Sequence, residues 1–151
     1  MEYVTDVNAD IAKRSIKCFG TIIIRLPNVA LGVCEQLKQM LVLRINYVTC
    51  AIMQVLKDVF RRHPALIENF IPFMNKAILE QLNESAGRSS FVWIVGQFGK
   101  YIHDGPYIME KIIEEEVVTN SIELQKYLVV ACTKLFFEKA PEMHKILVTL
   151  Y

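Results

Sequence analysis

The residues whose side chains could support catalysis or metal binding are dispersed along this sequence. The three histidines, His63, His103 and His144, stand near predicted helix ends. None has a second histidine, a cysteine or a carboxylate at the spacing of a known ligand motif. A cationic imidazole at a helix C-terminus is stabilised by the helix dipole, so a structural role accounts for His63 and His103. We therefore expect no metal ion and no catalytic histidine.

The four cysteines also stand singly. Cys18, Cys34, Cys50 and Cys132 each lie among apolar residues, and no CxxC-type pair is present. Buried, reduced thiols are typical of the cores of cytosolic proteins. We interpret all four cysteines as core residues of this kind.

Two further patterns could carry chemistry. Glu114, Glu115 and Glu116 form a run of carboxylates, but successive helix positions point about 100° apart, so they cannot act as a catalytic pair. Residues 85–90 are rich in serine, yet they lack the GxxxxGK[ST] pattern of a phosphate-binding loop. We interpret the glutamates as a solvated helix surface, and we expect no enzyme activity and no cofactor.

Composition limits the class of partner. Lys and Arg (17) nearly balance Asp and Glu (16), for a net charge of +1, which does not favour a nucleic-acid-binding domain. Hydrophobic residues make up 53% of the 151 residues, enough for one domain with a buried core. Apolar runs are interrupted by charges such as Arg25, so no stretch is long enough to span a membrane. The sequence lacks an N-terminal signal pattern and predicts a soluble, cytosolic protein.

Apolar residues recur at helical spacing along almost the whole chain. Four prolines, Pro27, Pro64, Pro106 and Pro141, follow or interrupt these apolar stripes at intervals of 37, 42 and 35 residues. Each proline marks a turn between two predicted helices. A period near 40 residues, with two helices in each unit, is typical of HEAT and armadillo repeats.

The sequence therefore predicts an all-α fold, a right-handed α-solenoid of about four HEAT/armadillo-type helical hairpins. The expected hairpins span approximately residues 7–43, 46–82, 85–118 and 121–151. One hairpin cannot bury both of its apolar stripes, so neighbouring hairpins must stack. Pro72 predicts a kink or a break in the helix expected from Ala65 to about Leu82. Gly96 and Gly99, expected inside a helix, predict a close approach between packed backbones.

The two ends of the sequence do not resemble the ends of a solenoid. Residues 146–151 form an apolar run, whereas a complete solenoid closes with a polar capping repeat. We therefore expect this chain to be a piece of a longer protein.

Several short stretches resemble the trunk of β-adaptins, in order and at consistent spacing. They are residues 3–7 and 11–16, residues 55–64 (VLKDVFRRHP), Gly87-Arg88 with residues 93–96 (WIVG), and residues 134–136 (KLF). β-Adaptins are large subunits of the heterotetrameric adaptor complexes that select cargo for coated vesicles. Within the family, residues 105–110 look most like the β subunit of the fourth adaptor complex, with the first and second complexes as the next candidates. The first hairpin departs from the family pattern at residues 18–21 (CFGT).

The resemblance implies a mid-to-late segment of the β trunk. In the family, this solenoid curves around the N-terminal domain of the medium subunit and meets the second large subunit. The implied role is a non-enzymatic scaffold for vesicle-mediated cargo sorting, with the medium, second large and small subunits as partners and no nucleic acid. The implied location is cytoplasmic, on trans-Golgi or endosomal membranes only through the assembled complex.

The second helices of HEAT hairpins usually line the concave face of the solenoid. Four polar residues on these helices, Lys38, Asn75, Lys76 and Lys111, are therefore candidate partner contacts, with plain solvation as the alternative for each. Two other functions stay open at this point. One is another HEAT-repeat scaffold, such as a nuclear-transport receptor or a phosphatase scaffold. The other is a helical domain of an enzyme whose catalytic part lies outside this sequence.

Overall fold

A computed structural model describes residues 8–116 and 121–150 of the chain. All regular elements within these residues are helical, which confirms the predicted all-α fold. They are α1 (Ala9–Arg25), α2 (Pro27–Val42), α3 (Asn46–Arg62), the 3₁₀ segments η2 (Pro64–Asn69) and η3 (Ile71–Phe73), α4 (Lys76–Leu79), α5 (Ser85–Gln97), α6 (Gly105–Glu116), α7 (Ile122–Glu138) and α8 (Ala140–Leu150).

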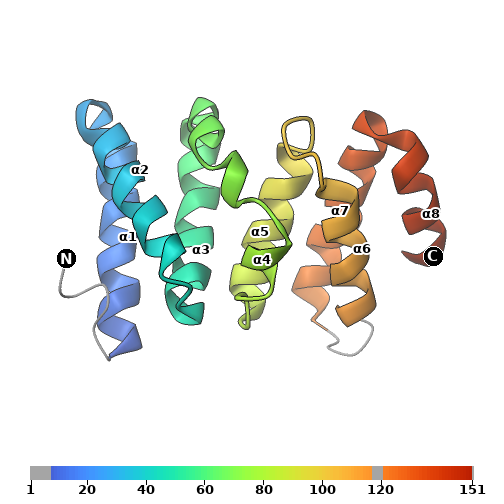
Figure 1. Cartoon of the computed structure of the whole chain (residues 1–151), viewed down its shortest axis with the longest axis horizontal. Coiled ribbons are helices and arrows are strands. Elements are labelled where there is room, and N and C mark those ends of the chain that lie inside the picture. Colours follow the sequence, from blue (N-terminus) through green and yellow to red (C-terminus); the bar gives the residue numbers. More distant parts are fainter. Residues whose placement is uncertain (1–7, 117–120, 151) are drawn as a thin grey trace.

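The helices form two layers along one row (Figure 1). Helices α1, α3, α5 and α7 pack side by side and make direct contact along the row; we call them the first-helix layer. The second-helix layer consists of α2, the segment from η2 to α4, α6 and α8. Each hairpin contributes one member to each layer, and the apolar stripes of both members meet between the layers.

The first-helix layer is held together by close contacts at glycine. A Cβ atom placed on Gly96 of α5 would lie 2.5 Å from Cβ and 2.6 Å from Cα of Ala131 in α7. The predicted close backbone approach at Gly96 is thus confirmed. Gly99 also faces α7, where an added Cβ would overlap Leu135 Cδ2, but it lies beyond the end of α5 and not inside a helix as predicted. Only residues without a side chain allow these two helices to approach so closely.

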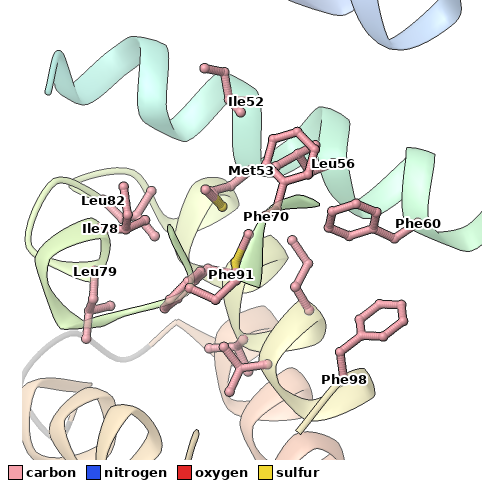
Figure 2. Close-up of a cluster of buried hydrophobic side chains, with 14 of the residues drawn as sticks. Ile52, Met53, Leu56, Phe60, Phe70, Ile78, Leu79, Leu82, Phe91 and Phe98 are labelled. Atoms are coloured by element: carbon pink, nitrogen blue, oxygen red, sulfur yellow. The ribbon is translucent and has the colours of Figure 1, made fainter. Parts of the chain in front are cut away.

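An aromatic cluster joins α3 to the following hairpin (Figure 2). The ring of Phe60 lies edge-on to Phe70 and to Phe98, with both centroid distances at 5.7 Å. All three side chains are buried. Edge-to-face pairs of this kind contribute about 0.5–1.5 kcal/mol each beyond the burial of apolar area, so the cluster fixes α3 against both the η2–η3 segment and the end of α5.

The second half of the second hairpin differs most from the prediction. The break expected at Pro72 is confirmed, but the long helix on either side of it is wrong, since η2, η3 and the short α4 replace it. Proline has no N–H to donate, and its ring clashes with the carbonyl four residues earlier, so an α-helix cannot run through this point. Ile67 and Phe70 are buried and hold the irregular segment against the core.

Other differences concern the edges of the predicted hairpins. The four prolines predicted to mark turns all lie at the first or second position of a helical segment and not between helices: Pro27 begins α2, Pro64 begins η2, Pro106 follows the first residue of α6 and Pro141 follows the first residue of α8. Proline is tolerated there because the first N–H groups of a helix have no partner within it. The predicted hairpin ends at residues 7, 118 and 151, and the β-adaptin-like residues 3–7, lie outside the described part of the chain.

Candidate partner-binding surfaces

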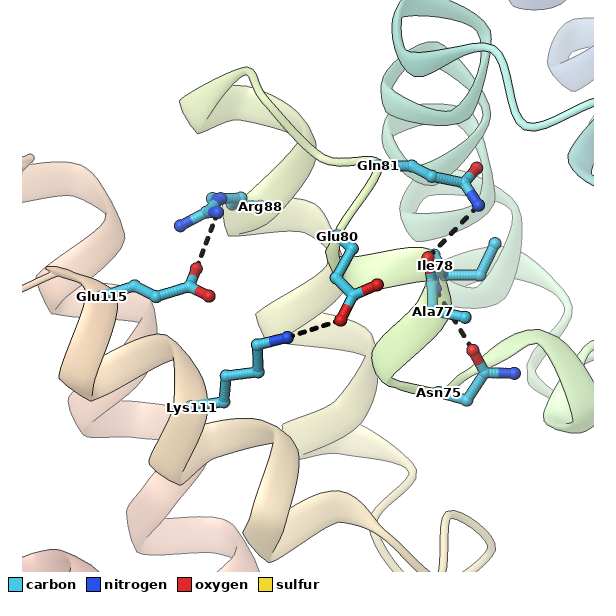
Figure 3. A network of polar contacts seen from close by, with 8 residues as sticks. All are labelled: Asn75, Ala77, Ile78, Glu80, Gln81, Arg88, Lys111 and Glu115. Carbon is cyan, nitrogen blue, oxygen red and sulfur yellow. Dashed lines mark hydrogen bonds and ion pairs between the residues drawn. The ribbon is translucent and has the colours of Figure 1, made fainter.

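Lys111 lies on α6, in the second-helix layer, and its side chain already has an intramolecular partner. Its Nζ donates to Glu80 Oε1 at 2.8 Å, which links α6 to the end of α4 (Figure 3). This hydrogen bond lowers the pKa of Glu80 and raises the pKa of Lys111. Glu80 is 65% exposed, so the pair can open toward another molecule at small cost, because exposed ion pairs contribute little to stability.

Asn75 and Lys76 lie at the start of α4. The Asn75 side chain accepts a hydrogen bond from the N–H of Ile78 (3.2 Å) and donates one to the carbonyl of Pro72 (2.8 Å), so it caps the short helix (Figure 3). Lys76 Nζ lies 5.7 Å from the ring centroid of Tyr107 on α6, a cation–π distance. Asn75 is therefore primarily a structural residue, whereas Lys76 stays at the surface.

Lys38 is set apart from the other three candidates. It lies on α2 and pairs with Glu35 of the same helix at 2.5 Å. The structure groups Asn75, Lys76 and Lys111 around the contact of α4 with α6, and places Lys38 further along the row (Figure 1). All four lie on the second-helix layer, but only three of them form one local group.

Sequence reasoning missed an arginine that connects three segments. Arg88 of α5 donates through Nε to the carbonyl of Leu82 (2.7 Å). Through a terminal nitrogen it also donates to Glu115 of α6 (2.8 Å) (Figure 3). The interpretation of Glu115 as a merely solvated residue was wrong, because its carboxylate is half-buried and paired. A signal was available: the helix dipole disfavours a cation near a helix N-terminus, so an arginine in this place indicates a specific partner.

A buried polar pair anchors α4 to the first-helix layer. Thr49 Oγ1 of α3 donates to Gln81 Oε1 at 2.9 Å, and both residues are buried. The amide nitrogen of Gln81 donates in turn to the carbonyl of Ala77 at 3.2 Å (Figure 3). Buried polar groups must be hydrogen-bonded, so this pair fixes where α4 lies.

The thiols do not form a reactive site. Cys34, Cys50 and Cys132 are buried as predicted, and burial raises their pKa, to about 12 for Cys132. A thiol with a raised pKa carries little of the thiolate that acts as nucleophile. The prediction for Cys18 was wrong: it is exposed, because it lies on the solvent side of α1.

The histidines do not converge on a common point. His63 Nε2 lies 3.4 Å from the carbonyl of Ile24, and the main-chain carbonyl of His103 accepts a hydrogen bond from Lys139. Across residues 8–116 and 121–150, no three His, Cys, Asp or Glu side chains are placed to hold a metal ion together.

Two surface grooves have room for a small ligand. One, of about 290 Å³, lies between α1 and α3 and is lined by cations of α1 and by Gln54 and Asp58 of α3. The other, of about 400 Å³, lies between the turns at Pro27 and Pro64 and is mostly apolar. Neither groove combines a serine, threonine or cysteine with a base. Over the same described ranges, no helix is both long and apolar enough to cross a bilayer.

Comparison with known sequences identifies the family to which these stacked helices belong. Residues 1–150 match the family described as the adaptin N terminal region. The chain belongs to the adaptin family. This adaptin segment is 29% identical over 148 residues to beta-adaptin-like protein A of Arabidopsis thaliana, and 28% identical over 145 residues to AP-1 complex subunit beta-1 of Homo sapiens. It is also 24% identical over 149 residues to AP-1 complex subunit beta of Dictyostelium discoideum.

These similarities cover 96–99% of the adaptin segment but only 15–18% of each relative. The chain thus spans less than a fifth of the length of the curated relatives it matches. The family assignment confirms the resemblance to β-adaptins at the level of the family. It also agrees with the prediction of a non-enzymatic protein, since adaptins are adaptor subunits.

Proposed function

We propose that this chain is a trunk segment of the β subunit of an adaptor complex, and that it works as a non-enzymatic scaffold in vesicle-mediated protein transport. Its partners would be the N-terminal domain of the medium subunit, the second large subunit and the small subunit. The observation that carries the proposal is the match of nearly the whole hairpin stack to β subunits of adaptor complexes.

We assign the contact with the medium subunit to the second-helix layer. Lys38, Lys76 and Lys111 all place an ammonium group on this layer, and the carboxylates that pair with Lys38 and Lys111 are well exposed. Because exposed ion pairs contribute little to stability, these lysines can pair with carboxylates of a partner without weakening the fold. Asn75 would support the surface by capping α4.

Capture of the chain by the N-terminal domain of the medium subunit would test this assignment. We expect the triple variant Lys38→Gln, Lys76→Gln and Lys111→Gln to reduce capture at least about tenfold. Asn75 is left intact, because loss of a helix cap costs about 1 kcal/mol and would confuse binding with folding. A matched control removes the same number of charges outside the second-helix layer, by neutralising the exposed residues Arg25, Lys100 and Lys126.

Two different outcomes would refute the assigned binding surface and the adaptor function. Equal capture of the triple variant and the unaltered chain would refute the second-helix surface. Failure of the unaltered chain to bind any adaptor subunit would refute the adaptor function itself.

Within the adaptins, we favour the fourth adaptor complex, with the first and second complexes as alternatives. The stretch at residues 105–110, which forms the start of α6, supports this choice. The corresponding location is the cytoplasmic side of trans-Golgi or endosomal membranes, reached through the assembled complex. Co-purification of the chain with the medium subunit of each complex in turn would decide: preferential binding to either alternative would refute the choice.

A further inference from the structure

The first-helix layer has an open face, opposite the side that the second helices cover. On α3, the residues Gln54, Lys57, Asp58 and Arg61 fall at the three- and four-residue spacing of one helix face, and none of them is buried. This face is independent of the second-helix surface proposed above for the medium subunit. Its charges and rings form a row across the layer.

The row begins with cations in the groove of about 290 Å³ between α1 and α3. Lys13, Arg14 and Lys17 line its α1 side, and Asp58 lines its α3 side. Lys13 is already paired with Glu84 at 2.8 Å. Arg14 and Lys17 are exposed, and no carboxylate of the described residues lies within ion-pair distance of either. The groove therefore offers two cations that lack an anionic partner.

The row continues with cations held over aromatic rings. Arg61 Cζ lies 4.9 Å from the ring centroid of Trp93 on α5. Lys57 Nζ lies 5.6 Å from the ring centroid of Tyr127 on α7, so this lysine of α3 reaches across α5. Arg61 also pairs with Asp58 of the same helix at 4.0 Å, an exposed pair that can open to a ligand at small cost. The cation–π contacts hold the long side chains of Arg61 and Lys57 in place before any ligand arrives.

We propose that this row, defined as Arg14, Lys17, Gln54, Lys57, Arg61 and Trp93 and called the basic strip, binds an extended acidic segment of a partner protein. Carboxylates of the segment would pair with Arg14 and Lys17 in the groove. The Gln54 amide, on the α3 wall of the groove, can both donate to and accept from a peptide backbone. An apolar side chain of the segment would pack against the half-buried ring of Trp93.

The dimensions set the length of the segment. From α1 to α5 the row crosses two helix–helix steps of about 8–10 Å each, and reaching α7 adds a third. An extended chain advances about 3.3 Å per residue. A segment of about five to nine residues would therefore span the basic strip.

A protein segment fits the strip better than a membrane surface does. The unpaired cations of α1 line a recess between two helices, alongside Gln54, so a narrow chain can reach into it. A planar array of lipid headgroups contacts charges that protrude from a surface, and it cannot follow them into a recess between two helices. The positive charge of the recess and its position between two helices thus favour a peptide over a membrane surface.

Fluorescence anisotropy with a fluorescein-labelled peptide of ten glutamates would test the proposal on the 151-residue chain. We expect saturable binding that weakens as salt is raised. Replacing Arg14→Gln and Lys17→Gln should lower the affinity about tenfold. Replacing Arg25→Gln and Lys100→Gln removes the same number of charges from exposed positions outside both proposed surfaces and should change the affinity less than about twofold.

Three results would overturn the basic strip. The first is equal weakening in both double variants, since binding would then depend on net charge alone. The second is no peptide binding even at low salt. The third combines two observations: the chain does not bind the peptide, and it sediments with phosphatidylserine vesicles unless Arg14 and Lys17 are replaced. This result would show that the two cations bind a membrane. Thermal melting of each variant, followed by circular dichroism, confirms that the variants fold.

Discussion

Replacement of Gly96 by alanine should destabilise the fold although it improves helix propensity. Gly96 lies within α5, where alanine alone would stabilise the helix by about 1 kcal/mol. The added methyl group would lie 2.5 Å from Cβ and 2.6 Å from Cα of Ala131 in α7. Carbon atoms pack best at about 3.5–4.0 Å, so α5 and α7 would have to move apart by about 1 Å.

The magnitude follows from these two opposing effects. Overpacking of a core contact costs about 1–3 kcal/mol, and the upper end applies here because Ala131 Cα belongs to the backbone and cannot rotate away. Subtracting the propensity gain of about 1 kcal/mol leaves a net loss of about 2 kcal/mol. For a chain of this size, that loss corresponds to a fall in Tm of about 4–8 °C.

The matched control is Gly32→Ala in α2. No atom lies within 4 Å of the Cβ position at Gly32, so only the helix propensity changes, and we expect a gain of about 0.5–1 kcal/mol. Urea denaturation followed by circular dichroism measures the free energy of unfolding of both variants. If the Gly96 and Gly32 variants are equally stable, the glycine-mediated contact between first helices does not hold the layer together.

Three further predictions concern single side chains. Replacing Lys111→Met should raise the pKa of Glu80 toward its ordinary value of 4.5, which NMR titration measures. In the unaltered chain, the pair with Lys111 stabilises the fold above pH 4.5, and this effect is lost as the pH falls through the lowered pKa of Glu80. An unchanged titration of Glu80 in the variant would refute the pairing. Iodoacetamide at pH 8 should alkylate Cys18 of the folded chain and leave the other three cysteines unmodified, as measured by mass spectrometry. Modification of a second cysteine as early as Cys18 would contradict this prediction. Replacing Thr49→Val leaves the buried oxygen of Gln81 without its donor and should cost about 1–3 kcal/mol in urea denaturation, whereas a loss under about 0.5 kcal/mol would contradict the anchoring role of this pair.

Much of the fold could be predicted because helical periodicity is a local property of sequence. The apolar spacing and the recurring prolines were sufficient to predict the helical hairpins, and Pro72 was sufficient to predict the break before α4. What Pro72 does not encode is the extent of the disruption. Short 3₁₀ segments replaced a helix because burial of Ile67 and Phe70 fixes the chain in that conformation, and burial depends on residues distant in the sequence.

The candidate surfaces were less predictable, because pairing between hairpins leaves little trace in a single sequence. The lysines of the second helices could be assigned to a layer, but their partners could not, since Glu80 and Lys111 are 31 residues apart. The same reason explains the missed pair of Arg88 with Glu115, 27 residues away. Cys18 shows the converse error: neighbouring apolar residues suggested burial, whereas its position on α1 faces solvent.

In the proposed function, a stacked helical surface, and not a reactive pocket, is the working part of this adaptin segment. Hydrogen–deuterium exchange of the chain, alone and bound to the N-terminal domain of the medium subunit, tests this surface. We expect slower exchange on binding in α2, α4 and α6, which carry the candidate contacts. Exchange that stays the same in all three helices, while the two proteins bind, would contradict it.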